Sequence, residues 1–232
     1  EMCIRDSVIG GDGTISQVVQ HLDLESQILA ILPSGTGNDL ARGLGLPRRT
    51  DCYMKALPDF VLREIDVWLM DGRRFINSAG FGLDAQVLAT MASSRGLARQ
   101  NYVAAFIATL PGLRPLYVRA TGNGEVLVDG DVWWLAALNS PFVGGGIPLA
   151  PRARLDDGKL DIVAVHACSK WELLLKLPRV TRGHHLKDPR VSCHQAARLT
   201  VESSQQPVAA EGDGELMTLY ERRIALVHAG RL

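Results

Sequence analysis

Two glycine-rich loops constrain the fold of this chain more than any other feature. The first lies in "VIGGDGTISQVV" (residues 8–19), where three glycines and Asp12 separate a β-branched strand end from apolar residues at helical spacing. The second, "PSGTGNDLAR" (33–42), follows the apolar run "QILAILP" and leads into another short helical pattern. Two successive strand–loop–helix units predict an α/β domain with both loops at the carboxyl ends of strands, where open sheets bind ligands.

The first loop has the composition of a phosphate-binding loop. Glycine lets the backbone approach a ligand closely, and the N-terminus of the following helix offers free N–H groups to an anion. The carboxylate of Asp12 repels a phosphate unless a cation lies between them, so the pattern favours a magnesium nucleotide. A tight Asp-Gly turn is the alternative. In the second loop, Asn38 or Asp39 is expected to cap the next helix.

Composition narrows the class of protein. The 232 residues are 47% hydrophobic and 22% charged, which predicts a packed protein of one large or two small domains. The formal net charge is zero, so no overall field attracts nucleic acid, and no nucleic-acid partner is expected. The four cysteines are far apart and indicate neither a disulfide framework nor a zinc site, which fits a reducing cytoplasm. The apolar runs are too short to span a bilayer.

The chain after residue 60 reads as mostly β-structure. Two strands are expected to meet in a hairpin at Asp71-Gly72, further strands to turn at "TGNGE" and "VDGD", and helices to occupy residues 83–110 and "SKWELLLKLPRVTRG". The predicted fold is an incomplete α/β domain (1–60) plus an all-β, sandwich-like domain (61–232) whose final strands are able to pack back on the first. The first seven residues, "EMCIRDS", lack periodicity and are expected to lie outside the fold, with preceding elements absent.

Several motifs together resemble one enzyme family. Besides the two loops, they are "RRFINSAGFGLDAQV" (73–87), "NSPFVGGGIPLAPRARLDDGKLDIV" (139–163), "GHHLKDPRV" (183–191) and "EGDGEL" (211–216). These collinear blocks resemble the diacylglycerol kinase catalytic family, a relative of sphingosine kinases and NAD kinases, and are most similar to its soluble bacterial lipid kinases. The resemblance implies an NAD-kinase-like first domain and ATP-dependent phosphorylation of a hydroxyl of diacylglycerol or a related lipid. A sphingoid or other hydroxy-lipid kinase, or a non-catalytic nucleotide- or lipid-binding regulator, are the alternatives.

The resemblance also implies roles for individual residues. Glu215 of the "DGE" motif is the expected base, and Asp12 is the second catalytic residue. Two of these assignments have alternatives. Asp66 could be an ordinary strand residue that faces solvent, and "EGDGEL" could be a hairpin turn with solvated acids. The carboxylates of Asp12, Asp39 and Asp66 are expected to hold the nucleotide magnesium, mostly through water. The expected nucleotide-binding residues are Gly10, Gly11, Asp12, Gly13, Thr14, Thr36, Asp39 and Asp66.

A second magnesium site is implied at "RLDDGKLD" (154–161). The carboxylate of Asp157 and backbone carbonyls near Arg154 and Lys159 are the expected ligands, with a plain Asp-Gly turn as the alternative. The two glycine loops are expected to lie side by side, with Glu215 facing them across a cleft. The three glycines at Gly144–Gly146 have two explanations. They could let a lipid headgroup or a neighbouring strand approach the backbone closely, or they could simply make the loop flexible.

The expected partner is a lipid substrate at the membrane surface, which places the protein in the cytoplasm, peripheral at the inner membrane. A homodimer is compatible with the resemblance. Basic residues gather between residues 170 and 190, as a solvated face or a docking surface for anionic lipid. Within that segment Leu173–Leu175 and Leu177 are interpreted as core. His184 and His185 are interpreted as structural or surface residues, because neighbours on a strand point to opposite faces.

Overall fold

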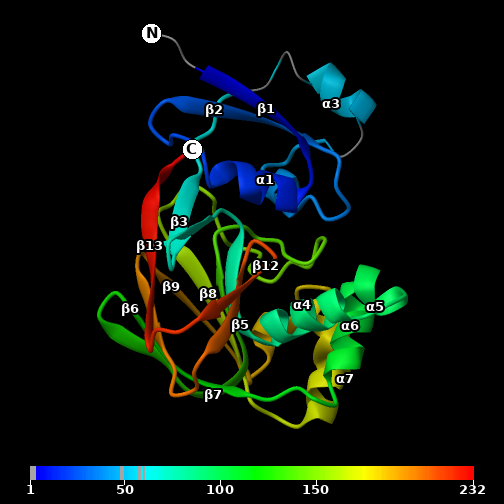
Figure 1. The fold of residues 1–232 in the computed structure, drawn as a ribbon, viewed down its shortest axis with the longest axis vertical. Coiled ribbons are helices and arrows are strands. Elements are labelled where there is room, and N and C mark those ends of the chain that lie inside the picture. Colours follow the sequence, from blue (N-terminus) through cyan, green and yellow to red (C-terminus); the bar gives the residue numbers. More distant parts are fainter. Residues whose placement is uncertain (1–3, 48–49, 57–58, 60) are drawn as a thin grey trace.

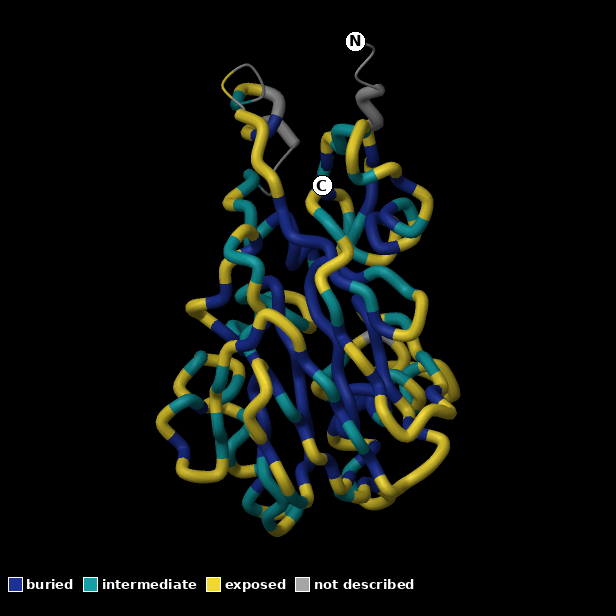
Figure 2. Tube along the Cα trace, turned by 90° about the vertical axis from the view of Figure 1, so that its left-hand side faces the viewer, coloured by how far each residue is buried: buried dark blue, intermediate teal, exposed yellow. Residues whose placement is uncertain are grey.

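The computed structural model describes residues 4–47, 50–56, 59 and 61–232. A small α/β part, which contains the first two strands, lies above a large β-rich body in Figure 1. Buried residues concentrate in the strands of the body, whereas loops and the outer faces of helices are exposed (Figure 2). The predicted combination of an α/β part and a sandwich-like β body is therefore confirmed.

The α/β part contains two parallel strands. β1 (Ile4–Gly10) pairs with β2 (Gln27–Pro33) along its whole length. The prediction that residues 1–7 lie outside the fold is wrong for residues 4–7, because these pair with residues 27–30; residues 1–3 lie outside the described residues. The helices of this part are α1 (Asp12–Val19), α2 (Asp39–Gly43) and α3 (Thr50–Ala56).

The body is built on one antiparallel sheet of eleven strands among the described residues, in the order β12-β11-β5-β7-β6-β10-β13-β3-β4, with β8 added to β7 and β9 to β8. The strands are β3 (Asp66–Met70), β4 (Arg73–Phe75), β5 (Ser78–Gly82), β6 (Leu116–Gly122), β7 (Glu125–Leu138), β8 (Leu160–His166), β9 (Val191–Ala196), β10 (Leu199–Glu202), β11 (Val208–Gly212), β12 (Glu215–Leu219) and β13 (Arg223–Arg231). Asp71 and Gly72, both at positive φ, form the predicted hairpin turn between β3 and β4.

Strand β7 joins two layers of the body. Its first half pairs with β6, whereas residues 134–138 pair with both β5 and β8. A register shift between Val132 and Trp134 accompanies this change of partners. The expected turn at "VDGD" is wrong, because those residues continue through β7, where Gly130 adopts φ +144°. The curled sheet encloses a core that includes Trp68, Phe75, Phe81 and Leu135.

The helices of the body gather on one side of the sheet (Figure 1). They are α4 (Leu83–Ser93), α5 (Leu97–Gln100), α6 (Tyr102–Thr109), α7 (Lys170–Val180) and the short 3₁₀ helix η2 (His185–Lys187). The helical segments predicted at 83–110 and after Ser169 are confirmed. Leu83, Phe106 and Leu173 pack with Trp133 and Leu138 of β7 in a second apolar cluster. The interpretation of Leu173–Leu175 as core is wrong for Leu175, which is exposed, although Leu173 is buried as expected. No helix among the described residues is long and apolar enough to cross a membrane.

A third apolar cluster joins the α/β part to the body. Ile15 and Leu40 of the α/β part pack with Val67 and Ile76 of the body. The last residue of the chain adds to this cluster, because Leu232 packs against it and exchanges backbone hydrogen bonds of 2.8 and 2.9 Å with Ile65. The shared core fixes the two glycine loops above the β-rich body.

Candidate functional site

The two glycine loops lie side by side, as predicted. The backbone N–H of Ser34 donates to the carbonyl of Gly10 at 3.0 Å. Gly11 and Gly35 then touch through their backbones: a Cβ on Gly35 would lie 2.4 Å from the Cα of Gly11, and one on Gly11 would lie 2.8 Å from the Cα of Gly35. The contact leaves no room for a side chain at either position, so both glycines are required by packing.

The carboxylate of Asp12 ties the first loop to the helix that follows the second. It accepts the backbone N–H of Asp39 at 3.0 Å and that of Leu40 at 3.1 Å. Asn38 instead adopts φ +52° and bonds back to Gly35, with its Oδ1 accepting the Gly35 N–H at 2.9 Å. The expectation that Asn38 or Asp39 caps α2 is therefore wrong, because Asp12 supplies that cap from the neighbouring loop.

The carboxylate of Asp39 faces the same space as that of Asp12. It accepts the Gly145 N–H at 2.8 Å and forms an ion pair with Arg42. Burial raises the pKa of Asp39 above its ordinary value, and repulsion from Asp12 adds to the rise. Between them, a Cβ on Gly37 would lie 2.8 Å from Asp12 Oδ2 and 3.8 Å from Asp39 Oδ2. Two facing carboxylates over a position without a side chain fit a divalent cation.

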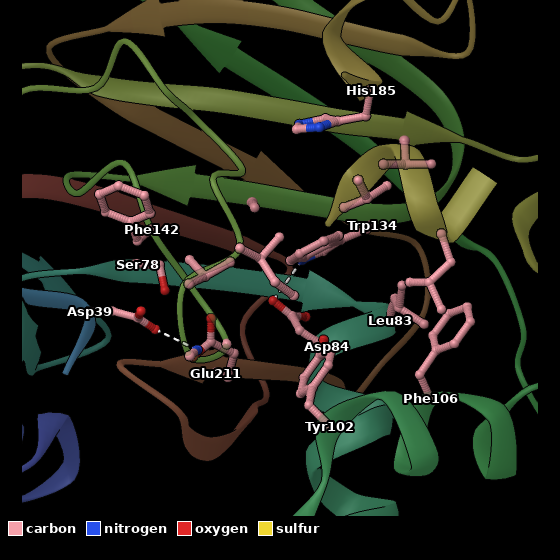
Figure 3. Close-up of a pocket in the computed structure, with 18 of the residues that line it drawn as sticks. Asp39, Ser78, Leu83, Asp84, Tyr102, Phe106, Trp134, Phe142, His185 and Glu211 are labelled. Atoms are coloured by element: carbon pink, nitrogen blue, oxygen red, sulfur yellow. Dashed lines mark hydrogen bonds between the residues drawn. The ribbon is translucent and has the colours of Figure 1, made fainter. Parts of the chain in front are cut away.

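A cavity of about 270 Å³ begins at these carboxylates and enters the body (Figure 3). Its polar end is formed by Asp12, Gly37 and Asp39, together with the turn of the β11–β12 hairpin. Aromatic and aliphatic side chains line the rest, among them Leu83, Leu88, Tyr102, Phe106, Trp134, Phe142, Val165, Leu173, Leu177 and Val180. The cavity therefore joins a carboxylate cradle to an apolar chamber.

A buried pair of carboxyl groups, Asp84 and Glu211, lines the cavity between its two ends. In Figure 3, Asp84 lies between Trp134 and Tyr102. It accepts the Trp134 Nε1–H at 2.7 Å and the Ala85 N–H at 2.8 Å. Burial raises the pKa of both groups, that of Glu211 well above its usual range, and the two side chains hydrogen-bond each other. The uncharged, protonated form of Glu211 is therefore favoured, and in that form its carboxyl donates to Asp84.

Sequence reasoning missed this pair. Strict alternation along β11 places Glu211 on the face opposite Val208 and Ala210, yet it is buried. One local signal was available in "GFGLD": a Cβ on Gly80 would lie 1.5 Å from Asp84 Oδ2, so the glycine leaves room for that carboxylate. The pairing itself joins α4 to β11 and has no sequence pattern.

We expect Glu211→Gln to weaken the loss of stability that the protein undergoes as pH rises. Folded Glu211 holds a proton that the unfolded chain releases near its ordinary pKa, so the folded state binds more protons above that value. The contribution of Glu211 to the free energy of unfolding is complete below its pKa in the unfolded chain. That contribution is lost as pH rises through its pKa in the folded protein. Glutamine cannot ionise, so the stability of the variant should fall less steeply than that of wild type over the pH range above the ordinary glutamate pKa of about 4.3.

Urea unfolding of both proteins across that range measures the difference. Asp213, whose pKa is raised to about 6 by burial, contributes a decline of the same sign in both proteins, so only the difference between them is diagnostic. Parallel stability curves would contradict a proton held at Glu211.

The "EGDGEL" segment is a hairpin turn, but its central acid is not solvated. Asp213 is buried and accepts the backbone N–H groups of Ile76, Asn77 and Ser78 at 2.9, 2.7 and 3.1 Å. These bonds fasten the turn to the start of β5 and place Gly214 on the cavity wall. Glu215, the half-buried first residue of β12, is not among the described residues that line the cavity, and its role as base stays a prediction.

Asp66 does not face solvent, which was the alternative to its expected role in nucleotide binding. It is fully buried, and its carboxylate lies 2.9 Å from His228 Nε2 and accepts the Arg231 Nε–H at 2.9 Å and the Gly158 N–H at 2.6 Å. That alternative is wrong because β13 and the 155–158 loop cover this end of β3. The structure thus brings Asp66 to the Asp157 turn, and the cavity wall that holds Asp12 and Asp39 does not include it.

The segment with Asp157 forms a tight turn. Asp157 Oδ1 accepts the Lys159 N–H at 3.1 Å, Gly158 adopts φ +68°, and the side chain of Arg154 pairs with Asp156. Among the described residues, no three His, Cys, Asp or Glu side chains gather as a metal site. Thr14 and Thr36 are exposed beside the glycine loops.

The two adjacent histidines differ in burial. His184 is exposed, whereas His185 is buried with Nε2 2.8 Å from the Leu149 carbonyl. The two residues lie at the start of η2 rather than on a strand. The interpretation of them as surface and structural residues is therefore kept, but the helix start, not strand alternation, separates them.

Family models match both parts of the chain. The model described as "Diacylglycerol kinase catalytic domain" matches residues 7–70, and "YegS C-terminal NAD kinase beta sandwich-like domain" matches residues 77–227. A diacylglycerol kinase of Bacillus subtilis (strain 168) is 32% identical over 225 residues, 91% of this chain and 73% of the relative. One of Mycobacterium tuberculosis (strain CDC 1551 / Oshkosh) is 33% identical over 216 residues, 89% of this chain and 69% of the relative.

Solved structures share the fold. A crystal structure described as a diacylglycerol kinase from Bacillus anthracis str. Sterne has a TM-score of 0.68 and 22% identity, over 96% of this chain and 73% of that one. Yeast NADH kinase complexed with NADH has a TM-score of 0.54 and 11% identity, over 97% of this chain and 58% of that one. The second likeness confirms the NAD-kinase-like fold.

Proposed function

The chain belongs to the diacylglycerol kinase family of lipid kinases, and we propose that it transfers the γ-phosphate of Mg-ATP to a hydroxyl of diacylglycerol or a closely related lipid. One observation carries the proposal: a single cavity connects the carboxylate cradle at Asp12 and Asp39 with an apolar chamber in the β-rich body. Phosphoryl transfer requires such a junction, because the acceptor hydroxyl must meet the phosphate in line.

The glycine loops form the proposed nucleotide end. Gly11 and Gly35 allow the two loops to approach each other, and exposed Gly13 and Thr14 lie in the first turn of α1, where N–H groups favour an anion. Asp12 and Asp39 would hold a magnesium ion between their carboxylates, which neutralises phosphate charge when bound. Arg42 orients Asp39 by its ion pair and donates to the Gly37 carbonyl at 3.1 Å. The chain's own residues thereby fix the cradle before a nucleotide binds.

The apolar chamber forms the proposed acceptor end. Its aromatic and aliphatic lining suits acyl chains, whose transfer from water is favourable by about 0.8 kcal/mol for each buried CH₂. A hydroxyl held where the chamber meets the cradle would lie beside the hairpin that carries Asp213 and Gly214. Glu215, the next residue of that hairpin, is proposed as the base that accepts the hydroxyl proton.

We also propose that the Asp157 turn holds a second, structural magnesium ion through the Asp157 carboxylate and the carbonyls of Arg154 and Lys159. The turn is anchored to the body, because Gly158 donates to buried Asp66. Magnesium should raise the melting temperature of the parent protein but not that of Asp157→Ala, since linkage disappears with the site. Asp156→Ala, which alters the exposed neighbour, is the control and should keep the shift. If magnesium raised the melting temperature of the parent and of Asp157→Ala equally, the segment would be an ordinary turn and not a metal site.

Incubation with γ-labelled ATP and a panel of lipids tests the proposed function. The panel contains diacylglycerol, monoacylglycerol, ceramide and a sphingoid base, and the label is followed into each. Label in diacylglycerol that depends on magnesium supports the proposal. If only the sphingoid base gained label, the proposed substrate would be wrong and the protein would be a sphingoid-base kinase. If no lipid gained label although nucleotide still bound, a non-catalytic regulator would be favoured.

A further inference from the structure

The hydrogen-bonded carboxyl groups of Asp84 and Glu211 connect the helical side of the cavity to the β11–β12 hairpin. Each residue is only 5% exposed, and Asp84 lies in the first turn of α4. Glu211 lies on β11, opposite Gly80 of β5 and Leu216 of β12. Helix α4 contacts both strands of the hairpin, so the pair is a polar link inside a packed junction.

Asp84 is fixed in place on the cavity wall. Its carboxylate accepts the Trp134 Nε1–H at 2.7 Å and the Ala85 N–H at 2.8 Å. Its Oδ2 occupies the space beside Gly80, where an added Cβ would lie 1.5 Å away. A buried carboxylate that is bound by two donors keeps one orientation, so a group that hydrogen-bonds to it is placed by it.

Glu211 carries this placement into the hairpin turn. Its Oε2 accepts the backbone N–H of Gly214 at 2.7 Å. Glu215 is the next residue along the chain, and it pairs with Gly212 across the hairpin. A continuous set of contacts therefore runs from Asp84 through Glu211 to the residue that precedes Glu215.

The two carboxyl groups form this link only while they share a proton. A hydrogen bond between them needs one O–H donor, whereas two carboxylates repel each other. Burial raises the pKa of Glu211 well above its usual range, and the charge of Asp84 adds to the rise. The link is therefore complete below the pKa of Glu211 in the folded protein and is lost as pH rises through it.

We propose that Glu211 is a positioning residue, which holds Glu215 in its productive place only while the Glu211 carboxyl carries the proton that it donates to Asp84. The inference rests on the proposed function, in which Glu215 accepts the proton of the acceptor hydroxyl. Two glutamates four residues apart then have opposite requirements. Glu215 acts as a base in its charged form, whereas Glu211 places it in the uncharged form. Turnover should therefore decline on the alkaline side, where a base alone would keep it constant.

Other titratable groups also face the pair. Tyr102 of α6 lies beside Asp84 in Figure 3, and burial, followed by the charge of the pair, raises the pKa of its hydroxyl well above the ordinary value. Asp213 of the hairpin acts on Glu211 through its charge, and burial raises the pKa of Asp213 to about 6. The other charged side chains that line the cavity are Asp12, Asp39, Lys176, Arg179, Asp188 and Arg190.

The pH profile of kcat in matched variants tests the positioning. Glu211→Gln keeps both hydrogen bonds, because its amide N–H donates to Asp84 and its carbonyl accepts from Gly214, but it has no proton to lose. It should match the wild-type kcat at neutral pH and lack the alkaline decline. Tyr102→Phe removes the neighbouring hydroxyl and should keep the decline. Melting curves at each pH restrict the comparison to conditions in which every protein is folded.

Removal of the link should lower turnover at every pH. Glu211→Leu has a similar volume but makes neither hydrogen bond, so it should lower kcat by up to about 10²-fold, the cost of a misplacement of about 1 Å at a catalytic site. Nucleotide affinity should stay unchanged, because the glycine loops are intact. If this variant does not fold, the comparison of wild type with Glu211→Gln still decides. A wild-type rate that stays constant over the alkaline range, or an equal decline in wild type and Glu211→Gln, would overturn the proposal.

Amide resonances separate this proposal from the proposed function. In ¹H–¹⁵N spectra the signals of Gly214 and Glu215 should move on the alkaline side in wild type and stay still in Glu211→Gln. If the proposed function fails, these signals still move in wild type alone, and neither protein phosphorylates a lipid. If only the positioning fails, both proteins phosphorylate lipid with one pH profile, and their signals respond to pH alike.

Discussion

Glu215→Gln is expected to lower kcat by about 10²–10⁴-fold, the usual cost of losing a general base. Glutamine keeps the shape of the side chain but cannot accept the proton of the acceptor hydroxyl. Glu215 is half-buried at the start of β12, and the turn before it is held by Asp213, so the variant should fold normally. Single-turnover kinetics with labelled ATP, together with a melting curve and a nucleotide-binding isotherm, measure these effects separately.

Two neighbouring glutamates make this prediction specific. Glu221 is exposed after β12, and Glu221→Gln should leave turnover unchanged. Glu211 lies inside the cavity, but burial raises its pKa well above the usual range, which disfavours the charged form that a base needs. A normal rate for Glu215→Gln with a collapsed rate for Glu211→Gln would transfer the role of base to Glu211.

The sequence predicts those parts of the fold that local chemistry specifies. Gly10, Gly11 and Gly13 follow a β-branched run, and that pattern alone indicates a strand, a loop and a helix start. The turn at Asp71-Gly72 needs two residues at positive φ, which Asp and Gly tolerate. Strand β2 follows from an unbroken apolar run that ends at Pro33. In each case the deciding residues are neighbours along the chain.

The features that sequence reasoning missed depend on residues that are distant in sequence. Period-2 alternation assigns Asp66 to a solvent face, but β13 and the Asp157 turn cover it and supply Arg231 and Gly158 as partners. Asp12 caps a helix that begins 27 residues later, which capping patterns do not anticipate. The Asp84–Glu211 pair likewise forms only when α4 and β11 meet. Tertiary packing, rather than local propensity, decides each of these.

Gly35→Ala is expected to destabilise the α/β part and to abolish tight nucleotide binding. The new methyl group would lie 2.4 Å from the Cα of Gly11 and 3.2 Å from its backbone N, so one loop must move away from the other. Overpacking of this kind costs about 1–3 kcal/mol or more. That cost lowers the melting temperature of a protein of this size by roughly 2–4 °C per kcal/mol. Separated loops also displace Asp12 from the N–H groups of Asp39 and Leu40.

Gly13→Ala is the matched control in the same pair of loops. A Cβ on Gly13 would meet no protein atom within 4 Å, and the residue lies in α1, where alanine is favoured over glycine by about 0.5–1 kcal/mol. Its melting temperature should therefore equal or exceed that of wild type. Weaker nucleotide binding in this intact variant, measured by calorimetry, would then come from the ligand itself approaching α1. An unchanged nucleotide affinity of Gly13→Ala would count against the first loop as a nucleotide-binding loop. An unchanged melting temperature of Gly35→Ala would count against the contact between the two loops.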